Sequence, residues 1–238
     1  MRSSIFLCAA AAIVMAGLAA NTASAQMPPG GMGGPGGMGR ASGNQPTPEI
    51  SSTPVIEKPD AAATKAYNAG MKSLAKARDQ EAVAAGASNE DKKNAALEKV
   101  NDAYGRALDQ FTEALRNKGD MYDAWNQVGY IHLRLGAYEE SIDDYNHTLA
   151  LKPDLPEATL HRAEAYVAVD RLDDAKGAYM DLFNHARPLA DQLMSAMQRW
   201  MILHRTNANG MRASDIDAFD KWLQERDGIA KQTAALPH

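Results

Sequence analysis

The feature that most constrains this chain is a period of 34 residues in its central part. Positions 34 apart carry the same kind of side chain in three successive units, and four such columns stay in register with one another. A fixed period of this length is typical of folds that stack one supersecondary unit. The columns are small residues at Ala107, Ser141 and Ala175, aromatic residues at Phe111, Tyr145 and Tyr179, large apolar residues at Leu115, Leu149 and Phe183, and a fourth set at Tyr104, Tyr138 and Leu172.

The spacing inside each unit predicts a pair of packed α-helices. Residues four apart lie on the same face of a helix, so a small residue followed four positions later by an aromatic one lets two helices approach and fills the space beside their contact. Such a helical hairpin cannot bury its apolar face alone, and we therefore expect each unit to stack on the next. Alanine is abundant and aromatic residues make up only 6% of the chain, which favours helices over sheets.

Two of the units share a longer signature. The first carries Trp125, Val128, Gly129, Gly136, Tyr138, Ser141, Tyr145, Leu149 and Pro153, and the second carries Ala158, Ala163, Tyr166, Leu172, Ala175, Tyr179 and Leu182. This order of residues resembles the tetratricopeptide repeat (TPR), with Ser141 in place of the usual alanine. The resemblance implies that Trp125 packs between helices, that Gly129 permits a close crossing, and that Gly136 ends the first helix.

The resemblance also implies an architecture. We expect an all-α, right-handed α-solenoid of about three TPR hairpins with an enlarged first hairpin and a C-terminal capping pair. The matching residues serve packing, so the resemblance indicates a fold more strongly than a function. The expected divisions of the domain at 60–238 are an extended first hairpin at 60–119, regular units at 120–154 and 155–187, and degenerate capping helices at 188–238.

The first hairpin contains an insertion. Gly70 and Ala107 are 37 positions apart, whereas Gly129 and Ser141 are 12 apart, so 37 − 12 = 25 residues have been added. One interpretation of residues 79–97 is a helical arm that turns near Gly86, and the other is a charged loop. In the helical interpretation Ser88 and Asp91 form a capping pair. Alanines would then allow tight contact between the two helices, at positions 75, 77, 82, 84, 85, 95 and 96.

The C-terminal pair is expected to be degenerate. Leu193, Met197 and Trp200 continue the 34-residue columns, but Ala218 and Trp222 repeat the small-then-aromatic step nine residues late. We expect the last helix to start at Ser214, with Asp217 in its first turn. The methionines on the preceding helix are predicted to form a core seam, and an adaptable groove is the alternative. They are Met194, Met197 and Met201.

The N-terminal segment predicts export. Arg2 precedes an apolar run at residues 5–20, and Ala23-Ser24-Ala25 is a small-residue cleavage site, so residues 1–25 are predicted to be a signal peptide cleaved between Ala25 and Gln26. An uncleaved membrane anchor is the alternative. Cleavage would place the protein in the periplasm or outside the cell. It would also leave no cysteine, because Cys8 is the only one.

Residues 26–59 are rich in glycine, proline and methionine and are expected to be a disordered linker. Met27, Met32 and Met38 raise the alternative of a Cu(I) site, since thioether ligands select that ion. Their loose spacing and the lack of a neighbouring histidine favour a flexible tether.

The chain shows little sign of catalytic chemistry. It contains no G-x-S-x-G, no H-E-x-x-H and no phosphate loop, so we expect no enzyme and no cofactor or metal. His161 and Glu164 are three apart on one helix face, which leaves zinc as an alternative, but no third ligand is evident. His132 is expected to be a packed interhelical histidine. An acidic cluster is expected to face solvent, at Glu139, Glu140, Asp143 and Asp144.

The predicted function is a non-enzymatic scaffold of the cell envelope that binds a protein or peptide. The net charge of −5 argues against nucleic acid as a partner. In the TPR family the first helix of each unit lines a concave groove, and here that face suggests a ligand with some basic character and an apolar anchor. A self-associating envelope component that acts through the extended hairpin or the C-terminal helices is the alternative. The groove residues expected by matching positions are Tyr67, Asn68, Met71, Asp123, Asn126, Gln127, Tyr130, Arg134, Glu157, His161 and Glu164.

Overall fold

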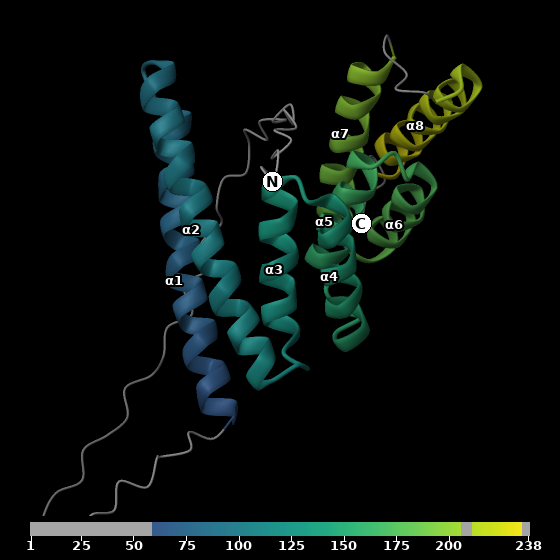
Figure 1. The fold of residues 1–238 in the computed structure, drawn as a ribbon. Coiled ribbons are helices and arrows are strands. Elements are labelled where there is room, and N and C mark those ends of the chain that lie inside the picture. Colours follow the sequence, from purple (N-terminus) through teal and green to yellow (C-terminus); the bar gives the residue numbers. More distant parts are fainter. Residues whose placement is uncertain (1–58, 206–210, 235–238) are drawn as a thin grey trace, which may run out of the picture. The chain divides into compact units, whose positions relative to one another are not determined.

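The computed structural model describes residues 59–205 and 211–234, and these residues form helices and no strand (Figure 1). The predicted all-α class is therefore confirmed. The predicted signal peptide, the predicted linker up to residue 58 and the methionines considered as an alternative Cu(I) site lie outside the described residues. The described helices are α1 (Pro59–Ala85), α2 (Glu90–Asn117), α3 (Tyr122–Leu135), α4 (Tyr138–Leu151), α5 (Pro156–Ala168), α6 (Leu172–His185), α7 (Arg187–His204) and α8 (Ala213–Ala234).

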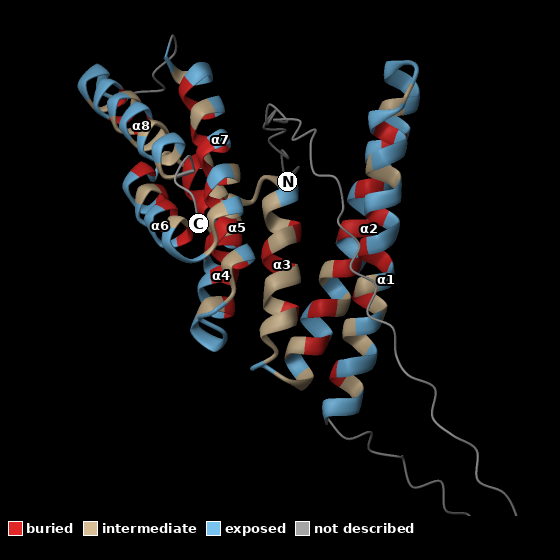
Figure 2. Cartoon of the chain, turned by 180° about the vertical axis from the view of Figure 1, so that it is seen from behind, coloured by how far each residue is buried: buried red, intermediate tan, exposed pale blue. Residues whose placement is uncertain are grey.

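Each helix packs against the next one in the chain, and short connections reverse the chain direction between them (Figure 1). The odd-numbered helices also meet one another, because α5 contacts both α3 and α7. Buried residues lie along every helix, and the outer helices also carry many exposed residues, whereas Glu157 is the single exposed residue of α5 (Figure 2). None of the described helices combines the length and the apolar character that a bilayer-crossing helix needs.

The small and aromatic columns lie in the core. Ala107, Ser141 and Ala175 are fully buried, and so are the three aromatic residues that follow them by four positions. The Ser141 hydroxyl donates a hydrogen bond of 2.9 Å to the carbonyl oxygen of Gly129, which ties α4 to α3 at their crossing. A Cβ atom on Gly129 would lie 3.2 Å from Cβ of Asp144 and from the Tyr145 ring, so glycine lets the two helices cross closely without displacing these neighbours.

The insertion is helical. α1 has 27 residues and α2 has 28, against 14 in each of α3 and α4, and the turn between them falls at residues 86–89. The buried residues of α1 lie along one side of the helix, at steps of three, four and seven as in a coiled coil. They are Ala63, Gly70, Ser73, Leu74, Ala77 and Ala84.

Two details of the predicted arm are wrong. The residue that caps α2 is Asn89, whose side chain accepts a hydrogen bond of 2.9 Å from the backbone N–H of Lys92; the cap is thus one position later than the predicted Ser88. Among the alanines expected at the contact, only three are buried, because a two-helix contact covers one stripe of each helix. Ala77, Ala84 and Ala96 are buried, and Ala75, Ala82, Ala85 and Ala95 are exposed.

Left-handed backbone ends the first helix of two successive pairs. Gly136 has φ +78° and caps α3, as predicted. Asp170, which is 34 residues later, has φ +62° and follows α5. This conformation is uncommon for a residue with a side chain, and the Asp170 carboxylate accepts a hydrogen bond of 3.0 Å from the Trp200 indole N–H. At the position where the preceding pair has Gly136, this pair therefore has a residue whose side chain bonds to α7.

The C-terminal pair confirms the core seam and corrects the register of the last helix. Met194, Met197 and Met201 are buried in one cluster with residues of α4 to α8. Ala218, predicted as the small contact residue, is exposed, and α8 begins at Ala213 rather than at Ser214. Large apolar side chains set the contact of α8 instead, so the 34-residue register does not extend past the connection before it. They are Ile216, Phe219 and Leu223.

Candidate binding face

The predicted groove residues lie on α1, α3 and α5, and the surface that these helices form is the candidate binding face. At the N-terminal ends of α1 and α3, this face is apolar and has an acidic residue at its edge. Tyr67 is half-buried, and its ring centroid lies 5.5 Å from that of the buried Phe111. Met71 packs against the same cluster one turn later. Burial raises the pKa of the Tyr67 hydroxyl, and the negative charge of Asp123 on α3 adds to the effect. The predicted residues Tyr67, Met71 and Asp123 are therefore brought together.

In the middle of the face, aromatic rings from α3 and α4 lie beside a histidine of α5. The His161 ring lies 6.0 Å from the Tyr130 ring and 6.1 Å from the Tyr145 ring, measured between centroids. Its Nδ1 atom lies 2.9 Å from a carboxylate oxygen of Glu164. Burial raises the pKa of Tyr145 well above its ordinary value, with the charge of Glu164 as the next cause. The predicted residues Tyr130, His161 and Glu164 therefore form one contiguous cluster.

Toward the C-terminal ends of α1 and α3, an ion pair joins the two helices. Nε and one terminal nitrogen of Arg134 donate to the same oxygen of Glu81, at 3.2 and 2.7 Å. The Tyr104 hydroxyl of α2 donates to that oxygen as well, at 2.7 Å. Burial alone lowers the pKa of Arg134, but the hydrogen bond and charge of Glu81 outweigh it and raise the pKa. Beside this pair, the Arg78 guanidinium lies 5.1 Å above the Tyr130 ring.

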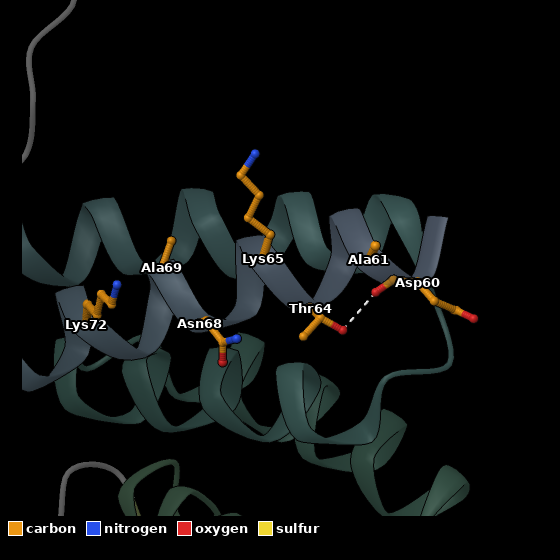
Figure 3. Close-up of a pocket in the computed structure, with 7 residues that line it drawn as sticks. All are labelled: Asp60, Ala61, Thr64, Lys65, Asn68, Ala69 and Lys72. Carbon is orange, nitrogen blue, oxygen red and sulfur yellow. Dashed lines mark hydrogen bonds between the residues drawn. The ribbon is translucent and has the colours of Figure 1, made fainter. Parts of the chain in front are cut away.

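The remaining predicted residues form no hydrogen bond or ion pair with the side chains described above. Glu157 is exposed at the start of α5 and forms no ion pair with the described residues, and Gln127 is half-buried with no hydrogen bond among them. Asn126 is half-buried, and its side-chain oxygen lacks a hydrogen-bond partner in the described chain. Asn68 is exposed and lines a shallow hollow on α1 with Thr64, one turn away on the same side of the helix (Figure 3). All residues of that hollow belong to α1, so it is a helix surface and not a cleft between elements.

His132 is packed between helices, as expected, but one of its neighbours corrects a prediction. Its Nδ1 atom lies 2.6 Å from a carboxylate oxygen of Asp144, which is buried rather than facing solvent. The hydrogen bond from Asp144 raises the pKa of His132 above its ordinary value of 6.5, although burial opposes the shift. Glu139, Glu140 and Asp143 are exposed as predicted.

Two residues of the face, Arg78 and Glu81, escaped the sequence analysis. Tyr104 and Tyr145 are buried beneath the face and contact its residues from the core. Arg78 lies seven positions after Met71, and Glu81 lies ten positions after Met71, so both lie on the same side of α1 as Met71. Helical periodicity carried through the insertion would have found them. The motif comparison stopped at Met71, because the regular unit has no counterpart for the added turns.

The described face is suited to recognition by stacking, ion pairing and hydrogen bonding. Within residues 59–205 and 211–234, no three histidine, cysteine or carboxylate groups converge to hold a metal ion. His161 and Glu164, the pair considered for zinc, bond to each other. No protein-family model matches the chain, and no curated protein matches it in sequence.

Proposed function

We propose that this protein is a non-enzymatic scaffold built of TPR-like helical pairs, which binds a peptide or a partner protein on the face formed by α1, α3 and α5. One observation carries the proposal. Residues far apart in the sequence form a continuous strip across three helices, from Arg78 over Tyr130 to His161. Packing alone does not require such a strip of half-exposed aromatic and charged side chains on one face.

The proposed partner offers an apolar anchor and a basic group. Tyr67 and Met71 are half-buried and leave apolar surface for an anchor at the N-terminal end of the face. Asp123 and Glu157 form no ion pair with the described residues, so both carboxylates are available to a lysine or arginine of the partner. Glu164 and Glu81 are different, because His161 and Arg134 already pair with them.

The proposed location is the periplasm or the exterior of the cell. It rests on the export signal predicted at residues 1–25 and on the predicted cleavage before Gln26. A partner would then belong to the same compartment, which guides the choice of peptide library in the test below.

Selection from a displayed peptide library, followed by titration calorimetry with the selected peptides, tests the proposal. We expect the double variant Asp123→Lys/Glu157→Lys to weaken binding of basic peptides at least tenfold, because it reverses both available charges. Tyr130→Ala is expected to weaken it further by removing the centre of the aromatic strip. Glu164→Lys is unsuitable as a test, since it also breaks the contact with His161.

The matched control is Asp143→Lys, a charge reversal of an exposed residue on α4 outside the face. It is expected to leave binding unchanged. A library that yields no binding peptide, or selected peptides that bind the Tyr130→Ala variant as well as the natural protein, would contradict the proposal.

A further inference from the structure

Helices α7 and α8 enclose a hollow that is independent of the α1, α3 and α5 face. Its volume is about 420 Å³. The lining residues on each side have the spacing i, i+3, i+4 and i+7, which is the spacing of a single helix face. They are Gln198, Met201 and Ile202 of α7 with its C-cap residue Arg205, and Asp220, Leu223, Gln224 and Asp227 of α8.

The hollow has an apolar floor and a protruding apolar side. Met201 and Leu223 are buried at 4% and 3% exposure and form the floor. Ile202 is 73% exposed, more than any other large hydrophobic residue in the described part of the chain. Leaving such a side chain in water is unfavourable relative to burying it. A projecting apolar residue therefore stands directly beside an apolar recess.

The charged residues that line the hollow lie at its two ends, an ion pair at one end and a carboxylate at the other. Arg205 pairs with Asp220 at one end. At the other end Gln198 is opposite Asp227, because α7 and α8 run in opposite directions. Among the described residues, Asp227 pairs with the exposed Lys231, one turn later on its own helix, and such surface pairs add little stability. The Asp227 carboxylate is thus open to exchange for a better partner.

From these features we infer that the hollow is the contact between two copies of this chain, related by a two-fold axis. In an isologous contact, the same surface of each copy meets the other. A two-fold axis near Met201 sets α7 of one copy antiparallel to α7 of the other. The Ile202 side chain of each copy then enters the recess of the second copy.

The same operation pairs the charges. It brings Arg205 of each copy level with Gln198 of the other, and hence beside Asp227 of that copy. Both Arg205–Asp227 contacts form together, one at each end of the interface. A foreign partner would need to reproduce the projecting apolar group and the guanidinium at this spacing, whereas a second copy carries both by symmetry.

The size of the surface sets the expected strength. α7 has 18 residues and therefore runs about 27 Å, and two helices side by side are about 20 Å wide, which gives roughly 500 Å² on each copy. Stable complexes bury about 800 Å² on each partner. We therefore expect a weak dimer whose population rises with protein concentration.

Sedimentation velocity of the full chain over a concentration series is the test. The natural protein is expected to shift from monomer to dimer as its concentration rises, and Ile202→Asp is expected to weaken this association at least tenfold, because it brings a carboxylate into the apolar recess. The control is Leu203→Asp, which changes the adjacent residue, also exposed (54%) but outside the hollow. It is expected to associate like the natural protein.

A charge exchange tests the orientation of the two copies. Arg205→Asp is expected to weaken association by placing two carboxylates together, and the added change Asp227→Arg is expected to restore it by rebuilding the pair with its signs reversed. Helical circular dichroism checks that each variant is folded. The inference is overturned by a natural protein that stays monomeric throughout the series, by equal effects of Ile202→Asp and Leu203→Asp, or by a double variant that associates no better than Arg205→Asp.

Discussion

The α1–α2 and α3–α4 pairs cross through the same contact, yet one pair is about twice as long as the other. In each pair a glycine on the first helix faces a fully buried aromatic ring on the second, Gly70 against Phe111 and Gly129 against Tyr145. The two contact residues are 41 positions apart in the first pair and 16 in the second. The difference, 41 − 16 = 25, equals the number of residues inserted. The crossing is thus fixed by one local contact, and the helices are extended beyond it.

The two pairs differ in what supports them on either side. α3 and α4 lie between α2 and α5, so neighbours cover both flanks of the pair. The far part of α1–α2 is held mainly by small residues of the two helices themselves, such as Ala77, Ala84 and Ala96. Fewer buried apolar contacts mean a lower free energy for local opening. We therefore expect the two crossings to contribute similarly to stability, and the added part of α1–α2 to open more easily than either crossing.

Truncating the aromatic residue at each crossing has the largest expected effect. Phe111→Ala and Tyr145→Ala are each expected to lower the free energy of unfolding by about 3–5 kcal/mol, because both remove a fully buried ring. Urea denaturation followed by circular dichroism measures the change. Tyr145→Phe is the control and should cost little, since the hydroxyl has no hydrogen-bond partner in the described chain. A small loss for Phe111→Ala beside a large one for Tyr145→Ala would show that the crossings are not equivalent.

Adding a methyl group to each glycine separates the two crossings. A Cβ on Gly70 would lie 2.6 Å from Cε1 of Phe111, so the buried ring must move, and overpacking of this kind costs about 1–3 kcal/mol. A Cβ on Gly129 would meet its nearest atoms at 3.2 Å, and the gain of about 1 kcal/mol from helix propensity should offset most of that cost. The same denaturation experiment is expected to show Gly70→Ala as the more destabilising change.

The control for both glycines is Gly105→Ala on α2, where an added Cβ would meet nothing within 4 Å. It should stabilise the protein by up to about 1 kcal/mol through helix propensity alone. If Gly129→Ala proves as costly as Gly70→Ala, the crossing of α3 and α4 is tighter than the distances indicate.

A polar contact beside each crossing is neutral in one pair and titratable in the other. Ser73 donates a hydrogen bond of 2.9 Å to Gln110 in α1–α2. His132 and Asp144 occupy the same places relative to the glycine and the aromatic residue in α3–α4, with 2.6 Å between their polar atoms. Only the second pair should therefore make the stability of the fold depend on pH near neutrality.

The direction of that dependence follows from the raised pKa of His132 in the folded protein. The protonated histidine favours the folded state, so the contribution is complete below the ordinary pKa of 6.5 and is lost as the pH rises through the higher folded pKa. We expect a contribution of about 1 kcal/mol. Unfolding measured from pH 5 to 9 (about two units on either side of the ordinary histidine pKa) should show this decline for the natural protein. The exchange His132→Ser/Asp144→Gln should remove it, and a decline that persists would assign it to other groups.

The sequence predicted the crossings because the 34-residue columns mark residues that must be buried together. It was less informative where burial and charge conflict. Asp144 lies in the buried stripe with Ser141, Tyr145 and Thr148, but an acidic cluster suggested solvent exposure. The spacing of the stripe was the better indicator, since His132 compensates for burying the carboxylate.

The candidate face was harder to predict than the core. Tyr130, His161 and Glu164 follow from positions within the repeat, and they do lie together. The Glu81–Arg134 contact joins residues 53 positions apart, across the insertion. No fixed period relates these two residues, because the added turns of α1 have no counterpart in α3. Their meeting depends on how the helices are placed in space.

Removing the cap of α2 has the smallest expected effect and separates the two regions most clearly. Asn89→Ala should cost about 0.5–1 kcal/mol, because it leaves the backbone N–H of Lys92 without its hydrogen bond. Since the end of the arm contacts little beyond itself, hydrogen exchange should become faster at residues 86–96 and stay unchanged around Gly129 and Tyr145. Asn89→Asp keeps an acceptor at the cap and should restore slow exchange. Faster exchange throughout α3 and α4 would instead mean that the arm and the regular pairs unfold as one unit, so that the extension beyond the crossing is not energetically separate from it.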